Sequence, residues 1–219
     1  MKVIRYAIIA TLIVLFGATF IVFPVLPDRF ASHWDASGTV NGYLPVLWGA
    51  FLVPLMTAGI VALFLVLPRI DPLRKNYGKF QRHYDGFIFI FALFMLVIQL
   101  QLLLWNTGYE ISPNTTFPII FGILFIYIGF LLEHAEQNWF VGIRTPWTLS
   151  SEMVWKKTHA VGGTLFKVAG IVSLFGILAG RYALWFSIGP VIAVAAFTVI
   201  YSYLEFRKET GSSKTPPSL

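Results

Sequence analysis

The chain has 219 residues, of which 57% are hydrophobic and only 12% are charged, with a formal net charge of +6. A soluble domain carries about 25% charged residues because water must wet its surface, so this composition excludes an ordinary soluble globule and indicates a chain surrounded by lipid. The basic residues lie in short segments between apolar runs, which argues against nucleic-acid binding, and the absence of cysteine excludes disulfides and thiolate metal sites.

Six apolar stretches are long enough, or nearly so, to cross a bilayer as helices, which takes about 20 residues each. They cover residues 6–23, 48–67, 87–105, 117–132, 164–180 and 182–204. The first stretch is longer than the apolar region of a signal peptide and has no cleavage site, so we interpret it as a retained span. Lys167 lies at one end of the fifth stretch, where its amine is expected to reach the lipid headgroups. The predicted fold class is therefore an all-α integral membrane protein with six transmembrane helices.

The placement of lysine and arginine predicts the orientation of these spans. The segments expected inside carry nearly all of the basic residues, whereas those expected outside carry only Arg29 and Arg181. We therefore predict a multi-pass protein of the cell membrane with both termini in the cytoplasm. The predicted parts are a helical hairpin with an outer loop, a basic cytoplasmic loop, a four-helix membrane domain and a disordered cytoplasmic tail, at residues 1–67, 68–86, 87–205 and 206–219.

The loop between the first two spans contains the outer candidates for ligand binding, which are His33, Trp34, Asp35, Gly38, Gly42 and Tyr43. The two glycines suit tight turns. Two interpretations stay open for this segment. It is either a folded cap that Trp34 and Tyr43 anchor at the membrane interface, or a surface that binds a peptide or a lipid-borne ligand.

The long inner loop contains a second group of candidates, which are Asn138, Gly142, Arg144, Thr145, Pro146, Trp147, Thr148, Trp155, Thr158 and His159. Pro146 predicts an extended Thr145. Ser150 or Ser151 is placed to cap a short amphipathic helix that leads into span five.

Arg144 lies among three tryptophans, and its guanidinium can bind a carboxylate or a phosphate. The alternatives are an anchor to lipid headgroups or an internal ion pair with Glu133 or Glu136. A metal site built from Glu133, His134, Glu136 and His159 is conceivable, but no H-E-x-x-H pairing occurs, and neither a metal nor another cofactor is predicted.

Other polar residues have simpler expectations. Asp71, His83 and Asp85 belong to the basic inner loop and are expected to be solvated. Gln99 lies near the middle of the third span, so its amide should form a hydrogen bond with another helix.

Two motifs carry a resemblance to known sequences. His33-Trp34-x-x-x-Gly38-x-x-x-Gly42-Tyr43 is similar to the H-W-x-x-x-G-x-x-x-G-Y signature of a widespread prokaryotic membrane domain of unassigned function. The segment 138–163 resembles the G-I-R-T-P-W-T…W-x-x-T-H motif of the SdpI family, whose long members contain both motifs.

That family is named for a membrane immunity protein, which protects a cell from its own secreted killing peptide and takes part in signalling by drawing a repressor to the membrane. The resemblance implies an immunity or signal-transducing protein and not an enzyme. The implied partners are membrane lipid, a secreted peptide toxin on the outer side and a regulator protein on the inner side, with no direct nucleic acid.

Two other functions stay open. A small-solute or ion transporter or channel would place ionisable residues at the membrane midplane and break helices in symmetric positions. An intramembrane metal-dependent enzyme would use the cluster of Glu133, His134 and His159.

Overall fold

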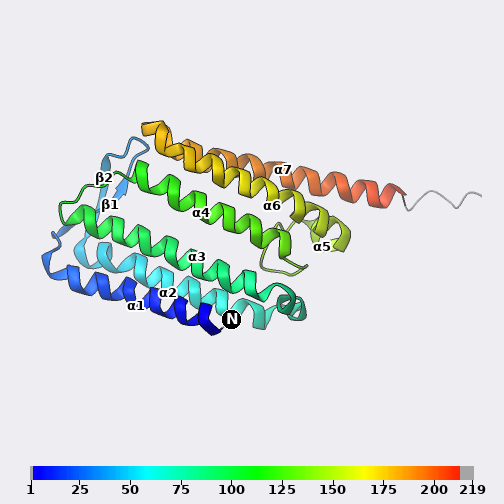
Figure 1. The fold of residues 1–219 in the computed structure, drawn as a ribbon, viewed down its shortest axis with the longest axis horizontal. Coiled ribbons are helices and arrows are strands. Elements are labelled where there is room, and N and C mark those ends of the chain that lie inside the picture. The colour runs from blue at the N-terminus through cyan, green and yellow to red at the C-terminus, as the bar shows by residue number, and fades with distance from the viewer. Residues whose placement is uncertain (1, 213–219) are drawn as a thin grey trace, which may run out of the picture.

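Long helices make up most of the chain in the computed structural model, which describes residues 2–212 (Figure 1). The helices are α1 (Lys2–Val22), α2 (Val46–Ile70), α3 (Arg74–Asn106), α4 (Pro113–His134), α5 (Pro146–Ser150), α6 (Glu152–Phe175) and α7 (Ala183–Ser212), with short 3-10 helices η1 (Phe23–Val25) and η2 (Gly176–Tyr182). The prediction of an all-α integral membrane protein is confirmed. A single hairpin of two short strands among the described residues, β1 (Arg29–Trp34) and β2 (Val40–Pro45), is the one departure from it.

Five stretches of the described residues are long and apolar enough to cross a membrane, and the last of them covers Glu152–Gly211. That stretch contains two helices, α6 and α7, which lie side by side in Figure 1 and are separated by η2. Gly180 reverses the chain there with a φ of 54°, a conformation that glycine adopts without steric strain. Six crossings therefore stay our prediction, with the hairpin of α6 and α7 supplying two of them.

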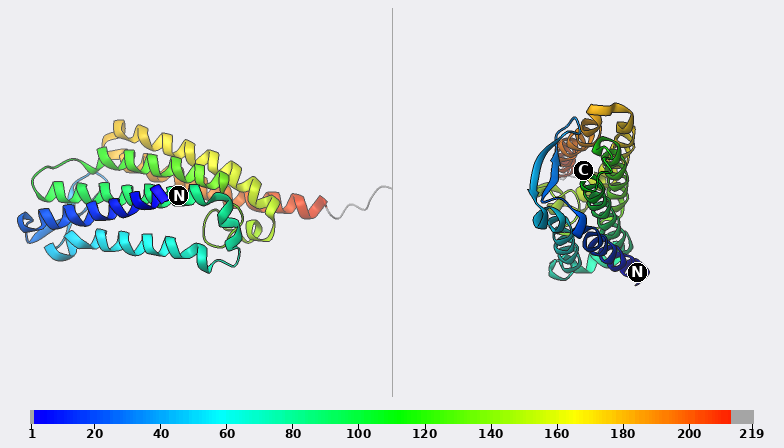
Figure 2. Two further views of the ribbon diagram at one scale, coloured as in Figure 1. Left: turned by 60° about the horizontal axis from the view of Figure 1, so that its bottom comes forward. Right: turned by 90° about the vertical axis from the view of Figure 1, so that its left-hand side faces the viewer.

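The long helices form two groups of three, α1, α2 and α3 in one and α4, α6 and α7 in the other, which meet where α3 contacts α4 (Figures 1 and 2). α4 and α6 approach closely through glycines. A Cβ added to Gly129 would lie 2.5 Å from the carbonyl oxygen of Gly163, and one added to Gly170 would lie 2.6 Å from that of Gly122. Small residues at such contacts let the backbones of membrane helices pack directly.

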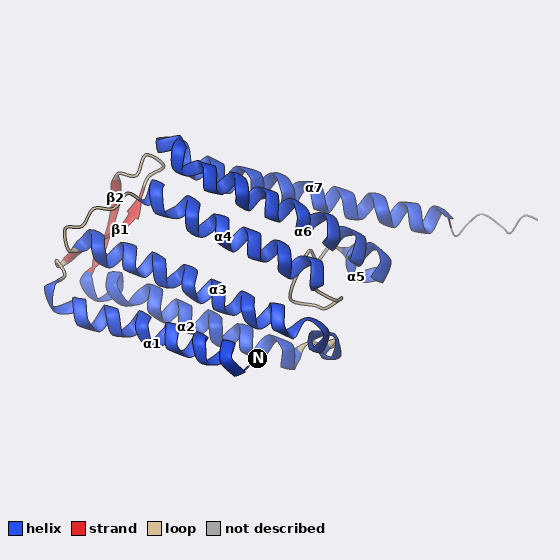
Figure 3. Cartoon of the chain, in the orientation of Figure 1, coloured by secondary structure: helices blue, strands red, loops and turns tan. Residues whose placement is uncertain are grey.

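The connections gather at the two ends of the bundle (Figure 3). The β-hairpin, the loop from α3 to α4 and η2 lie at one end. The start of α1, the turn from α2 to α3 and α5 lie at the other. Segments that the charge pattern assigns to the same side of the membrane therefore lie at the same end of the molecule.

Two polar residues within the membrane-spanning helices have partners on neighbouring helices. Gln99 is completely buried, and its Nε2 donates hydrogen bonds to the Thr19 hydroxyl and the Ala50 carbonyl, both at 2.9 Å, which confirms the expected contact with other helices. Lys167, which we expect near the headgroups at one end of its span, also has a partner within the protein. Its amine lies 2.6 Å from the Glu133 carboxylate, and the ion pair joins α6 to α4.

Two expected boundaries are also different. Ser151 caps a helix, as predicted, but that helix is the start of α6 and continues without interruption to Phe175, so the short amphipathic helix is not a separate element. Residues 206–212, which we assigned to a disordered tail, continue α7, where Lys208 forms an ion pair with Glu205 three residues earlier. Residues 213–219 of that tail lie outside the described residues.

Candidate functional site

The outer candidate residues lie on the two strands and in the turn of the β-hairpin. β1 and β2 pair antiparallel with Gly42 opposite His33, and a Cβ added to Gly42 would lie only 2.8 Å from the Cβ of His33. Gly38 lies in the turn with a φ of 87°, which disfavours any residue with a side chain. The two glycines of the motif are therefore required by the shape of the hairpin.

The hairpin is fixed to the end of α3. The Asn106 side chain accepts a hydrogen bond from the Ala31 amide at 2.7 Å and donates one to the Ala31 carbonyl at 3.0 Å. The Trp34 ring meets the Trp105 ring edge-on, with centroids 5.2 Å apart. Because one amide side chain satisfies both backbone groups of a strand residue, the hairpin is held in a fixed position relative to α3.

Asp35 begins the turn of the hairpin. Its carboxylate accepts hydrogen bonds from the amides of Ser37 and Thr39 at 2.9 and 3.0 Å and from the Ser37 hydroxyl at 2.5 Å. The Ser37 hydroxyl and then the Thr39 amide hold the pKa of Asp35 below its usual range, since both stabilise the ionised form. Asp35 therefore keeps the turn ordered and negatively charged at neutral pH.

The exposed face of the hairpin presents an aromatic ring and a cation. The Arg29 guanidinium lies 4.7 Å from the centroid of the Tyr43 ring, and Tyr43 is half exposed. His33 Nδ1 lies within hydrogen-bonding distance of the Asn41 side chain on the same surface. This face can contact a partner through cation–π, stacking and hydrogen-bonding interactions.

Most inner candidates form a folded loop that packs on the start of α6. Asn138 is completely buried, and its side-chain oxygen accepts from the amides of Phe140 and Val141 at 2.9 and 2.6 Å and from the Tyr77 hydroxyl at 3.3 Å. Its amide donates to the carbonyls of Glu136 and Val141, both at 2.9 Å. Asn138 therefore organises the turn that leads to Arg144 and ties it to α3.

His159 supports the same loop from α6. Its Nε2 accepts a hydrogen bond from the Ile143 amide at 3.0 Å, and its Nδ1 lies 2.9 Å from the Trp155 carbonyl, so we infer a neutral ring protonated at Nδ1. The ring also stacks on Trp155 with centroids 3.9 Å apart. Gly142, with a φ of 117°, passes so close to His159 that an added Cβ would overlap its Nε2.

The threonines of the motif form a second set of internal contacts. Thr145 has the extended conformation predicted from Pro146, and its side chain caps α5 by accepting from the Thr148 amide at 3.2 Å. The Thr145 hydroxyl also lies 3.0 Å from the Ser202 hydroxyl on α7. Trp147 packs on the Tyr203 ring of the same helix, at 5.0 Å between centroids.

Thr158 and Arg144 differ from these residues, because their polar groups have few or no hydrogen-bond partners among the described residues. Thr158 is completely buried, and its hydroxyl has no hydrogen-bond partner among the described residues. Arg144 is exposed and donates one hydrogen bond, at 2.6 Å, to the carbonyl of Trp139. No carboxylate pairs with Arg144 in the described part of the chain, since Glu133 is paired with Lys167. The guanidinium therefore keeps donors available for an anionic group.

Asp71 was not recognised from the sequence as part of this region. It is buried rather than solvated, because one carboxylate oxygen accepts from the Trp139 amide at 2.9 Å and the other from the Leu73 amide at 2.6 Å. Asp85 is likewise buried and pairs with Arg5 at 3.4 Å. The expectation that both carboxylates are solvated is wrong.

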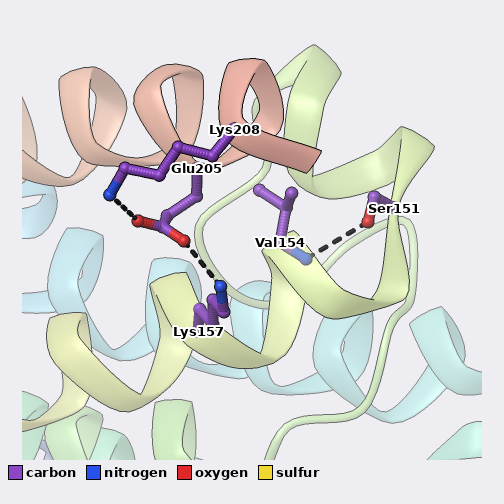
Figure 4. A network of polar contacts seen from close by, with 5 residues as sticks. All are labelled: Ser151, Val154, Lys157, Glu205 and Lys208. Atoms are coloured by element: carbon purple, nitrogen blue, oxygen red, sulfur yellow. Dashed lines mark hydrogen bonds and ion pairs between the residues drawn. The ribbon is translucent and has the colours of Figure 1, made fainter. Parts of the chain in front are cut away.

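Glu205 was missed as well. Its two carboxylate oxygens bind Lys157 at 2.8 Å and Lys208 at 2.6 Å (Figure 4). The ion pair with Lys157 joins the C-terminal part of α7, which we predict to be cytoplasmic, to the first turns of α6. The same view shows Ser151 capping α6 through the Val154 amide at 3.2 Å. The sequence gives no signal of the pairing with Lys157, because that residue lies 48 positions earlier in the chain.

The candidate metal ligands are used in other ways. Glu133 pairs with Lys167, His134 stacks on His83 with centroids 3.8 Å apart, and both ring nitrogens of His159 have backbone partners. Within residues 2–212 no group of three or more histidine, aspartate or glutamate side chains could hold a metal ion. The structure thus gives the hypothesis of a metal-dependent enzyme no geometric support.

Comparison with known proteins covers both candidate regions. Residues 134–202 match the model of the SdpI/YfhL protein family, and residues 10–58 match a domain of unknown function (DUF1648). The chain is similar to a protein of Bacillus subtilis (strain 168) described as "Immunity protein SdpI", with 26% identity over 201 residues, which is 90% of this chain and 93% of that protein. No solved structure matches the chain.

Proposed function

Because the chain belongs to the SdpI/YfhL family, we propose that it is a membrane immunity protein, which protects its own cell against a secreted peptide or a lipid-borne ligand. The similarity to a protein named for immunity carries this proposal, since it extends over nearly the whole of both chains. Both candidate regions lie within the matched families, the hairpin in one and the Arg144 loop in the other.

The proposed orientation places the β-hairpin outside the cell and the Arg144 loop in the cytoplasm. Six helices cross the cell membrane in this arrangement, and both termini are cytoplasmic. The charge distribution supports it, because the basic residues gather at the end of the bundle away from the hairpin and cytoplasmic segments of membrane proteins are rich in lysine and arginine.

The hairpin is the proposed receptor surface for the external ligand. Its exposed pair of Arg29 and Tyr43 is held in position by the contacts of Asn106 and Trp105 behind it. A rigid surface that combines an aromatic ring with a cation suits a peptide at the membrane interface, because little conformational entropy is lost when it binds.

The helix α3 is the proposed connection to the inner side. Asn106 at one end of α3 holds the hairpin, and Tyr77 at the other end donates to Asn138 in the Arg144 loop. A kink interrupts α3 at Phe80, where φ is −125° and ψ is 16°. A shift of α3 on ligand binding would reach the Arg144 loop through the hydrogen bond from Tyr77 to Asn138 and change the position of Arg144. We propose Arg144 as the contact for an anionic surface of a cytoplasmic regulator.

Survival of sensitive cells tests the proposal. Cells that express the full chain should survive a co-encoded secreted peptide that kills cells without it. Tyr43→Ala should raise sensitivity about tenfold, since loss of an aromatic contact at a binding surface costs on the order of 1–2 kcal/mol.

Tyr109→Ala is the matched control, because Tyr109 is also an exposed tyrosine and belongs to the loop from α3 to α4, which lies at the hairpin end of the molecule. The amount of each variant in the membrane must equal that of the unmodified protein. Failure of the unmodified protein to protect would refute immunity. Equal losses in the two tyrosine variants would refute the hairpin as the receptor surface.

A further inference from the structure

A cavity of about 660 Å³ opens among α1, α2 and α3 at the end of the bundle away from the hairpin. Four basic side chains line it: Arg5 at the start of α1, Arg69 at the end of α2, and Arg74 and Lys75 at the start of α3. Asp85 is the single acidic residue among the lining residues. The proposed receptor surface does not include this cavity, and the Arg144 loop touches it only through the hydrogen bond from Tyr77 to Asn138.

The charges of the cavity favour an anion. Asp85 is engaged by Arg5, whose Nε lies 3.4 Å from the carboxylate, and the Asp85 side chain is only 4% exposed. Arg69, Arg74 and Lys75 are exposed, and no ion pair joins them to an acidic side chain within residues 2–212. Three unneutralised cations therefore face one space from two helices, and an anionic group placed there would interact with all of them.

The back of the cavity is built from fixed side chains. The Tyr84 hydroxyl donates to the Phe64 carbonyl at 2.7 Å, and the Tyr77 hydroxyl donates to Asn138. Both rings are buried and meet edge-on, with centroids 5.4 Å apart. The cavity is thus preformed, which reduces the entropy lost when a ligand binds.

One wall of the cavity is apolar and continues onto the surface that faces lipid. Ile8, Ile9, Leu65 and Pro68 line it. Ile9 is 53% exposed and Leu65 is 40% exposed, on membrane-spanning helices α1 and α2. A soluble phosphate would contact only the basic part of this site. A phospholipid would contact both parts, with its phosphate among the cations and its acyl chains along α1 and α2.

We propose that this cavity binds the headgroup of an anionic phospholipid, such as phosphatidylglycerol. Basic pockets between membrane helices are suited to such headgroups, because attraction to the phosphate adds to the burial of the chains against apolar helices. The inference depends on the membrane location of the helices and not on the immunity function.

Binding of phosphatidylglycerol to the purified full-length chain in a neutral detergent tests the site, measured by native mass spectrometry across a lipid titration. Arg74→Gln combined with Lys75→Gln should weaken binding about 30-fold, since each basic group near an anionic headgroup contributes about fivefold. Lys79→Gln combined with Arg82→Gln is the matched control, because these residues lie on the same helix, outside the cavity lining. The control should stay within about threefold of the unmodified protein, because charges outside a binding site contribute little.

Three comparisons decide between this site and other sources of binding. Phosphatidylcholine should bind far more weakly than phosphatidylglycerol, and inorganic phosphate or glycerol phosphate should not displace the lipid at equal concentration. Equal losses in the two double variants would indicate nonspecific attraction to a basic surface and overturn the proposal. Displacement by either soluble phosphate would identify a soluble-anion site instead.

Circular dichroism and elution volume establish that each variant is folded. Should the Arg74 and Lys75 variant not fold, Arg69→Gln on α2 provides the second test, with an expected loss of about fivefold. Arg181→Gln at the opposite end of the bundle is its control. Unchanged binding in a folded Arg69→Gln protein would then reject the site.

Discussion

Gly142→Ala should strongly destabilise the inner loop, for two separable reasons. The backbone at Gly142 has a φ of 117°, where a residue with a Cβ is strained by roughly 1–3 kcal/mol. The new Cβ would also displace the His159 ring, and the Ile143 amide would lose its hydrogen bond to Nε2 at 3.0 Å. An amide left without a partner in a buried place costs about 1–3 kcal/mol. We therefore expect a total loss of roughly 2–6 kcal/mol in the free energy of unfolding.

Gly108→Ala separates the two causes. Gly108 has a φ of 93°, but an added Cβ would meet nothing within 4 Å, so only the backbone strain remains. Unfolding of the purified protein in mixed micelles with increasing sodium dodecyl sulfate, followed by circular dichroism, measures both variants. Gly142→Ala should be less stable than Gly108→Ala by about 1–3 kcal/mol, which is the cost of the unpaired amide.

A double-mutant cycle with His159→Ala tests the collision directly. His159→Ala already removes the ring and the hydrogen bond, so Gly142→Ala in that background should add only the backbone strain. The double variant should then be more stable than the sum of the single losses by about 1–3 kcal/mol, a coupling within the range for residues in contact. Additive losses, or a Gly142→Ala protein as stable as Gly108→Ala, would refute the reasoning.

Two further changes test contacts between helices. Gln99→Leu removes the hydrogen bonds to Thr19 and Ala50 and should lower the free energy of unfolding by about 1 kcal/mol in the same assay, as for other polar contacts between membrane helices; an unchanged stability would contradict it. Glu205→Gln breaks the ion pairs to Lys157 and Lys208. Trypsin should therefore cleave the end of α7 faster in the folded variant than in the unmodified chain. Equal cleavage rates would show that these ion pairs do not hold this end of the helix.

The sequence predicts the helices well because the signal is local. Apolar stretches of about 20 residues determine where a membrane helix lies, and the need of a buried amide for partners explains why Gln99 was expected to contact another helix. The break between α6 and α7 at Gly180 follows from the same local pattern.

The β-hairpin and the buried carboxylates were not predicted because their causes are not local. β1 and β2 have six residues each, and apolar and polar residues do not alternate regularly along either sequence, so the sequence does not distinguish them from a loop. The buried Asp71 carboxylate accepts a hydrogen bond from the Trp139 amide, and the buried Asp85 carboxylate forms an ion pair with Arg5. Each partner lies more than 60 residues away in the chain, and only the packing of the helices brings the two together.

The inner motif illustrates how a specific sequence pattern can encode shape more than recognition. The polar atoms of Asn138, Thr145, Thr148 and His159 are bound within the loop or to neighbouring helices, and Gly142 is required by the space beside His159. A ligand could engage these atoms only by replacing existing hydrogen bonds, which yields little net free energy. Arg144 differs, because the loop uses its guanidinium for one hydrogen bond and leaves it exposed. The rest of the motif therefore fixes the loop that carries this cation on the surface, in agreement with our proposal that Arg144 contacts an anionic partner.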